Sequence, residues 1–363
     1  MSGLYLHIPF CRQKCHYCDF VSFACKEELI DSYLCALDTE ASLFGQQTFD
    51  TLYIGGGTPS ILSVNQLDVL CEIVSRHFAP ISSFSESTVE ANPESLTPEK
   101  LKLLKQLGIN RLSLGLQSMN DYVLKRIGRV HDVNTFLAVY NHARQVGFEN
   151  ISIDLIAGLP EQSEQDFLTG LKQVLDLKPQ HLSVYGLQIE EATPFATAGV
   201  KVDDELLRKE LEQVHFILHE AGFVHYEISN FALPNFESRH NLAYWKNQEY
   251  LGLGPSAASY QKGQRYSNTS DLREYLRCMR FGKPAVEFSE KLTGKAKEGE
   301  AIMLGLRMLE GVHLTPHQQA LFSDEIEDIC QRGLVTLEDD LLKLTFEGMF
   351  LANQAFMAFV GPF

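Results

Sequence analysis

The N-terminal stretch LYLHIPFCRQKCHYC, residues 4–18, joins a short apolar run to a cluster of cysteines. The run is rich in branched and aromatic residues, which is typical of a buried strand. It leads into Cys11, Cys15 and Cys18, in the pattern C-x3-C-x2-C. Thiolates on one short loop are ligands for iron–sulfur clusters and for zinc. The stretch therefore predicts a metal centre on the loop after the first strand.

The spacing alone leaves two kinds of metal centre open. Three cysteines can wrap an iron–sulfur cubane and leave one iron free for a substrate or cofactor, since Cys25 is the next cysteine and does not continue the spacing. Zinc would take His7 or His16 as its fourth ligand. The chain has 8 cysteines in 363 residues, which is sparse for a disulfide scaffold and indicates a reducing compartment.

Working outward, the next part of the chain alternates between strand-like and helical patterns. The β-rich runs lie at 4–10, 51–57, 87–93, 111–117, 150–160 and 181–188, and the helical patterns lie at 29–44, 65–78, 97–108, 134–147 and 163–177. Such alternation predicts an α/β fold of βα units on a parallel sheet. Polar and glycine-rich residues follow the carboxyl ends of several successive strands. This favours a barrel, in which active sites occupy that face, over an open doubly wound sheet.

The charge balance argues against several classes of partner. The chain has 31 Lys+Arg and 47 Asp+Glu, a formal charge of -16. Because such a surface repels phosphate, we expect no nucleic-acid partner and no binding to anionic membranes. No apolar run approaches the length of a membrane helix, and no signal peptide is visible, so we expect no membrane span and a cytoplasmic location. The oligomeric state stays open.

The patterning changes after residue 200. We expect residues 1–200 to form the barrel, 201–284 to complete it, and 285–363 to form a mainly helical C-terminal domain. In this last part, helical patterns at 295–309 and 316–331 precede a strand, an acidic turn and a strand, which resembles a winged helix. A wing that reads DNA would be basic, whereas this region is acidic. We therefore expect a packing or interaction domain.

Several motifs together resemble the radical S-adenosylmethionine (SAM) superfamily, in particular its coproporphyrinogen-oxidase-like branch. The similarity extends over nearly the whole chain, and its motifs beyond the cysteines are IGGGTPS (54–60), EANP (90–93), RLSLGLQS (111–118), Gly128-Arg129 followed by His131, and IDLIAGLP (153–160). The resemblance implies a partial (β/α)6 barrel, which agrees with the six βα units. It also implies a [4Fe-4S] cluster on Cys11, Cys15 and Cys18, with SAM on the open iron.

The same resemblance implies which other residues surround the cofactor. The glycine run, with Gly56, Gly57 and Thr58, would let the backbone approach the methionine part of SAM, since glycine has no Cβ. Arg129 would suit the methionine carboxylate, because a guanidinium can pair with it in two hydrogen bonds. The remaining residues that match the family's contacts are Tyr5, Tyr17, Glu90, Gln117 and Asp154. Of these, Glu90 and Asp154 would suit the amine or the ribose hydroxyls.

Two departures separate the chain from the oxidases of this branch. Those enzymes carry Cys-x-Cys at the third cysteine and a long N-terminal extension, whereas here Cys18-Asp19-Phe20 follows and the first strand begins near residue 4. The chain is more similar to heme chaperones of the HemW type, which share a His-Asn-x-x-Tyr-Trp motif, present at 240–245. That similarity implies heme as a ligand and apo-hemoproteins as clients. An oxygen-independent coproporphyrinogen III oxidase is the alternative.

Within this motif, we expect His240 to bind heme iron, since imidazole is a good ligand for it. Tyr244 and Trp245 would offer flat faces to the porphyrin. Because the chain is acidic overall, the heme propionates need local cations, which Arg239 and Lys246 could supply.

Overall fold

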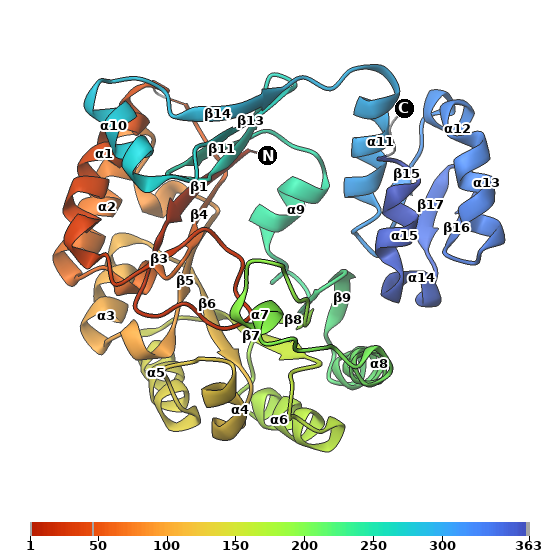
Figure 1. Cartoon of the computed structure of the whole chain (residues 1–363), viewed down its shortest axis with the longest axis horizontal. Helices are drawn as coiled ribbons and strands as arrows, with labels where there is room; N and C mark the ends of the chain where they lie inside the picture. Colours follow the sequence, from red (N-terminus) through yellow and green to blue (C-terminus); the bar gives the residue numbers. More distant parts are fainter. Residues whose placement is uncertain (1, 46, 361–363) are drawn as a thin grey trace.

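Six parallel strands form the centre of the protein and lie side by side in their sequence order (Figure 1). The computed structural model describes residues 2–45 and 47–360. The six strands are β1 Gly3–Ile8, β4 Thr51–Gly56, β5 Glu86–Ala91, β6 Arg111–Gln117, β7 Asn150–Ala157 and β8 His181–Gly186. The predicted fold class, a partial barrel of βα units, is confirmed.

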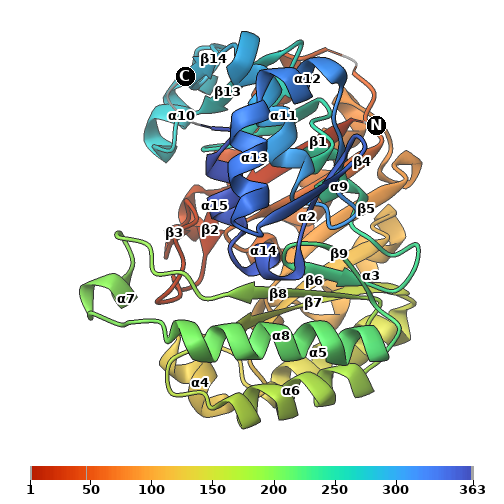
Figure 2. The ribbon, with the colours of Figure 1, turned by 90° about the vertical axis from the view of Figure 1, so that its right-hand side faces the viewer.

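Helices follow these strands, and the longer ones cover the outer side of the sheet. They are α1 Ile30–Ser42, α2 Val64–His77, α3 Pro98–Leu107, α4 Asp121–Arg126, α5 Val133–Val146, α6 Glu164–Asp176, α7 Pro194–Thr197 and α8 Asp204–Glu220, with 3-10 turns at Glu27–Leu29, Pro59–Ile61, Ile81–Ser83 and Pro93–Ser95. Their ends follow from local sequence: the Thr97 side chain caps α3 by accepting a hydrogen bond from the Lys100 amide, and Gly108 ends that helix. Figure 2 shows α5, α6 and α8 lying along the sheet.

The segment 201–284 differs from the barrel-completing segment expected from the sequence, because it extends both edges of the sheet. Strands β9 Val224–Glu227 and β10 Asn230–Ala232 add to β8, whereas β11 Tyr250–Leu253, β12 Ala258–Gln261, β13 Gln264–Asn268 and β14 Val286–Glu290 add beyond β1. Within each set the added strands pair antiparallel with their neighbours, so the 12-stranded sheet ends at β14 on one side and at β9 on the other. The sheet therefore stays open.

The helices of this segment are α9 Arg239–Trp245 and α10 Leu272–Arg280. Helix α9 crosses the open side of the partial barrel, between the central strands and the C-terminal helices (Figure 1).

The C-terminal region forms its own small unit. It contains α11 Gly294–Gly305, β15 Val312–His313, α12 Pro316–Leu321, α13 Ser323–Gln331, β16 Val335–Glu338, β17 Leu341–Leu344, α14 Phe346–Phe350 and α15 Ala352–Met357, with strand order β15-β17-β16. Two details differ from expectation. Strand β14 belongs to the large sheet although it follows residue 285. The helix expected over 316–331 is broken at Phe322, whose ring is fully buried in this unit's core.

Three hydrophobic clusters stabilise the described residues. One lies between the large sheet and its helices, a second holds the C-terminal unit together, and a smaller third one joins α4, α7 and the end of β7. Burial of apolar side chains in each is the main favourable contribution to folding. None of the helices in the described residues combines the length and the apolar character needed to cross a membrane.

Candidate cluster and cofactor site

The three cysteines lie on a loop at the carboxyl end of β1. The loop begins at β2 Phe10–Cys11 and returns at β3 Phe23–Ala24, which pairs with β2. The middle of the loop contacts the residue that follows α4, since the His16 amide donates to the Ile127 carbonyl at 3.0 Å. The adjoining α7 contacts the same loop, because the Phe195 amide donates to the His16 carbonyl. The loop is therefore supported on two sides.

The surroundings of the loop bear on the choice between an iron–sulfur cubane and zinc. Among the described residues, no group of three His, Cys, Asp or Glu side chains could hold a single metal ion. A cubane does not need such convergence, because each cysteine binds a different iron. His7, one of the two histidines considered for zinc, has both ring nitrogens engaged, because Nδ1 lies 2.9 Å from the Tyr5 hydroxyl and Nε2 lies 2.8 Å from the Val21 oxygen. In His16, Nδ1 lies 3.0 Å from the Arg126 oxygen, and Nε2 has no hydrogen-bond partner among the described residues.

Hydrogen-bond donors face two of the sulfur atoms. The Thr58 hydroxyl lies 3.4 Å from Cys11 Sγ, and Nη1 of Arg129 lies 3.6 Å from Cys15 Sγ. Such donors stabilise a thiolate and orient it as a ligand. Burial acts in the opposite direction and raises the pKa of the Cys18 thiol to about 11. Iron binding at this loop therefore has to displace thiol protons.

The glycine run at the end of β4 allows close contact with the cysteine loop and with His7. A Cβ on Gly57 would lie 2.7 Å from the Phe10 carbonyl oxygen and 2.9 Å from Cys11 Sγ. A Cβ on Gly56 would lie 2.8 Å from the His7 ring, and its φ of 112° disfavours other residues. The expected role of these glycines was close approach to SAM. The structure adds a second role, because they bring β4 against the cysteine loop.

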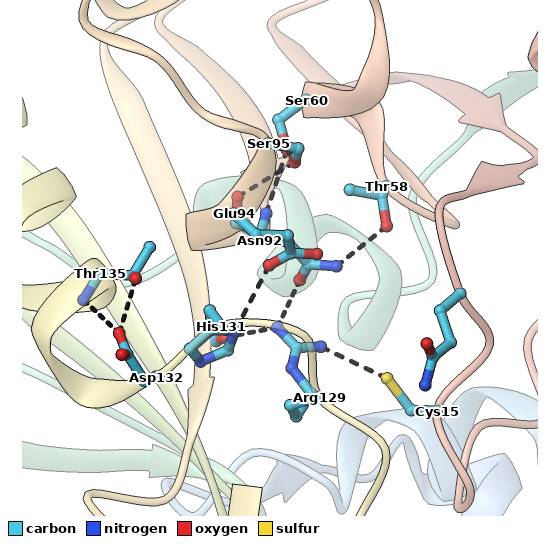
Figure 3. Close-up of polar contacts among 12 residues, drawn as sticks. Cys15, Thr58, Ser60, Asn92, Glu94, Ser95, Arg129, His131, Asp132 and Thr135 are labelled. Carbon is cyan, nitrogen blue, oxygen red and sulfur yellow. Dashed lines mark hydrogen bonds and ion pairs between the residues drawn. The ribbon is translucent and has the colours of Figure 1, made fainter. Parts of the chain in front are cut away.

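A buried guanidinium connects the cysteine loop to the neighbouring strands (Figure 3). Nη2 of Arg129 donates at 2.7 Å to both Asn92 Oδ1 and the Gly115 carbonyl. Asn92 in turn donates to Thr58 Oγ1 at 3.0 Å. Nη1 of Arg129 faces Cys15 Sγ. The Arg129 side chain therefore connects the cysteine loop to Asn92, which follows β5, and to Gly115 of β6. Behind it, His131 pairs with Glu94 at 3.4 Å.

Two half-buried carboxyl groups lie on neighbouring strands of the barrel, Glu90 on β5 and Asp154 on β7. Glu90 accepts hydrogen bonds from the Tyr53 hydroxyl at 2.7 Å and from the Gly56 amide at 3.2 Å. Burial raises its pKa to about 7, and the nearby Asp154 contributes in the same direction. Asp154 accepts from the Ser113 hydroxyl at 3.1 Å, and burial raises its pKa as well. In both groups, burial disfavours the charged form.

The other residues expected at the site lie around the same end of the barrel. Tyr5 on β1 bonds through its hydroxyl to His7 Nδ1 at 2.9 Å. Tyr17 packs against the apolar cluster that includes Ile156. Gln117 ends β6 at a φ of 73°, a left-handed conformation that costs energy outside glycine and is often found at functional sites.

His240 is the exception, since it lies far along the barrel from the cysteines. Its ring faces Thr51, the first residue of β4, with Nδ1 2.8 Å from the hydroxyl. Its Nε2 lies 2.8 Å from the Tyr244 hydroxyl, and the ring stacks on Tyr53. The side chain is 1% exposed, and burial lowers its pKa to about 3. Both nitrogens of the expected heme ligand are thus engaged within the protein.

The aromatic residues of the same motif line a cavity of about 400 Å³. Tyr244 and Trp245 form part of its wall with Tyr5, Phe20 and Tyr250, and Arg265 supplies a cation. Phe20 comes from the cysteine loop, so the cavity adjoins the candidate cluster site. Of the two cations expected from the sequence, Lys246 lies instead at a different cavity, beyond α9.

Asn92 and Tyr53 were missing from the residues expected at the site. Asn92 has a signal in the sequence, because it belongs to the EANP motif. Tyr53 has a weaker signal, since strand alternation places its side chain on the same face of β4 as Gly55. Only the fold reveals that its hydroxyl reaches Glu90 from the neighbouring strand.

Comparison with known proteins connects this geometry to characterised families. Residues 5–174 match the Radical SAM superfamily, and residues 292–351 match the HemN C-terminal domain. The chain is 37% identical to the heme chaperone HemW of Bacillus subtilis (strain 168), over 99% of this chain and 100% of that protein. It is 32% identical to the heme chaperone HemW of Escherichia coli (strain K12), over 99% and 98%.

A solved structure is also similar. Coproporphyrinogen III oxidase (HemN) from Escherichia coli, described as a radical SAM enzyme, superposes with a TM-score of 0.88 at 26% identity. The match covers 100% of this chain and 90% of that chain.

Proposed function

The chain belongs to the HemW heme-chaperone family within the radical SAM superfamily, and from this premise we propose that it binds heme and delivers it to apo-hemoproteins. The proposal includes a [4Fe-4S] cluster and SAM at the cysteine loop. The observation that carries it is the cavity lined by Tyr244 and Trp245, which adjoins that loop. All eight cysteines are free, which supports a role in the reducing cytoplasm.

At the cofactor end, each residue has a distinct task. Cys11, Cys15 and Cys18 would hold the cluster, which when bound supplies an electron and an open iron for SAM. Arg129 uses three of its five N–H groups within the protein, which leaves one on Nη1 and one on Nε, so a charged hydrogen bond to the methionine carboxylate is available. Glu90 accepts hydrogen bonds from the Gly56 amide and from Tyr53, which holds its carboxyl group in place for a ligand donor.

At the heme end, the cavity offers the chemistry that a porphyrin needs. Tyr244, Trp245 and Tyr250 supply aromatic surface, and Arg265 can pair with a propionate. Arg265 already forms an ion pair with Glu300, so a propionate would have to share or displace that partner.

His240 remains the proposed iron ligand, on one condition. Its Nε2 can reach an iron only after the Tyr244 hydroxyl releases it. The ring is already neutral, since burial lowers its pKa to about 3, and a neutral imidazole is the form that binds metal.

The test is anaerobic reconstitution of the full chain followed by hemin titration and an oxidase assay on the same sample. We expect a Soret band that shifts and weakens in His240→Ala, with unchanged iron–sulfide content. The control is His142→Ala, an exposed residue on α5. A wild-type protein that binds no heme would refute the proposal. Heme binding unaffected by His240→Ala would remove only that residue from the site.

The second candidate function is oxygen-independent coproporphyrinogen III oxidase, favoured by the structural match to HemN. Against it, Asp19 and Phe20 follow Cys18, so the Cys-x-Cys of those oxidases is absent. We expect no conversion of coproporphyrinogen III to protoporphyrinogen IX under anaerobic, reducing conditions. Sustained multiple turnovers would favour the oxidase instead.

A further inference from the structure

A second cavity, of about 560 Å³, lies on the other side of α9. Its walls come from α8 and β9 of the main part and from β17 and α14 of the C-terminal unit, which lie near each other in both views (Figures 1 and 2). Leu242 and Lys246 of α9 line it, whereas Tyr244 and Trp245 line the first cavity. The volume of this second cavity lies within the range typical of small-molecule sites, roughly 300–1,000 Å³.

Two histidines in this cavity form a directed pair. Nε2 of His225 lies 3.2 Å from the Ile228 carbonyl, which can only accept a hydrogen bond. In a neutral ring the proton is then on Nε2, so Nδ1 of His225 carries a lone pair. Nδ1 of His215 lies 3.1 Å from that atom and must therefore donate. This order places the free lone pair of His215 on its Nε2.

This is the arrangement found around metal-binding histidines. A ligating imidazole almost always donates its other N–H to a fixed acceptor, which orients the ring and raises its basicity. Within the described part of the chain, Nε2 of His215 has no hydrogen-bond partner, and the side chain is only half-buried. His240 differs in both respects, because its two nitrogens are engaged and its ring is buried.

The surroundings of His215 suit a flat, apolar ligand with negative groups at its edge. The Phe346 ring lies 5.3 Å from the imidazole, edge to face, and Phe216 is 52% exposed beside it. Met349 adds a thioether to the wall, and Lys343 is an exposed cation of the same cavity. The lining also holds Lys246 and two carboxylates, Glu237 and Glu310, and Lys246 lies 4.0 Å from Glu310, which leaves Lys343 as the cation for a propionate. Porphyrin rings pack on such faces, and their propionates pair with lysine.

We propose that this cavity is a second heme-binding position, in which Nε2 of His215 binds the heme iron. The inference rests on the proposed function, namely that the chain handles heme. With one cavity on each side of α9, the helix separates a heme next to the cofactor site from a heme next to the C-terminal unit.

The test is hemin titration of the full-length protein, with heme counted per chain and the Soret band recorded. We expect His215→Ala to lose one bound heme, or to weaken its binding at least about tenfold, which corresponds to about 1.4 kcal/mol. The matched control is His219→Ala, an exposed histidine one turn along the same helix and outside the cavity lining. It should titrate as wild type.

A surface variant covers the case in which His215→Ala folds poorly. Lys343→Glu reverses an exposed charge on β17, and we expect it to weaken heme binding without loss of helical circular dichroism. If wild-type protein binds heme and both His215→Ala and Lys343→Glu titrate as wild type, the inference is refuted and the chaperone proposal stands. If wild-type protein binds no heme at all, the proposed function fails together with the inference.

Discussion

Replacing Gly57 by alanine should prevent cluster assembly while leaving most of the fold in place. The added Cβ would lie 2.7 Å from the Phe10 carbonyl oxygen, 3.0 Å from its carbon and 2.9 Å from Cys11 Sγ. Nonbonded carbons prefer a separation of about 3.5–4.0 Å. The cysteine loop must therefore move away from β4 by about 0.5–1 Å.

That movement meets resistance from the backbone. The Thr58 amide donates to the Phe10 carbonyl at 2.8 Å, and the Gly57 amide donates to the Ile8 carbonyl at 2.9 Å. Overpacking costs typically about 1–3 kcal/mol, and loss of one such hydrogen bond adds about 0.5–1.5 kcal/mol. We expect a destabilisation of about 2–4 kcal/mol, with Cys11 displaced from its ligating position.

The assay is iron and sulfide content after anaerobic reconstitution, with thermal unfolding of the metal-free protein measured in parallel. The control is Gly186→Ala at the end of β8, where a Cβ would make only ordinary contacts of 3.4 Å with Leu207. That variant should retain its iron. Wild-type iron content together with a wild-type Tm in Gly57→Ala would show that the glycine is not needed for this close approach.

Three further predictions concern the same site. Cys15→Ala should abolish the cluster, whereas Cys35→Ala, at an exposed position, should retain it, as checked by iron and sulfide analysis. Arg129→Ala should weaken SAM binding by about 10- to 150-fold, since a charged hydrogen bond contributes about 1.5–3 kcal/mol, and an unchanged Kd by calorimetry would contradict this. Burial raises the pKa of Glu90 to about 7, above its unfolded value of about 4.3, so its contribution to stability is complete below the unfolded pKa and is lost as the pH rises through 7. The difference in Tm between wild type and Glu90→Gln should therefore fall as the pH rises from about 4.3 to about 7. A Tm difference that stays constant over this pH range would refute the raised pKa of Glu90.

The fold class and the cofactor loop could be predicted from the sequence because their signals are local. The cysteines are close in the chain, so their spacing alone limits the metal centre. Strand and helix patterns repeat with their own periods, and helix ends carry their own caps, as at Thr97. The sequence could not distinguish a cubane from zinc by spacing, whereas the structure argues against His7 as a zinc ligand, because both of its ring nitrogens are engaged within the protein.

The pairing of strands that are far apart in the chain could not be predicted from the sequence. Nothing local reveals that 201–284 supplies strands to both edges of the sheet, or that β14 joins the sheet from beyond residue 285, since edge pairing depends on which hydrogen-bonding groups are left free after the centre has formed. The histidines show the same limit most clearly. A motif singles out His240, but only packing determines that both its nitrogens are engaged by Thr51 and Tyr244. No motif singles out His215, and its free lone pair exists because tertiary structure sets His225 against one side of the ring and leaves the other side open to a cavity.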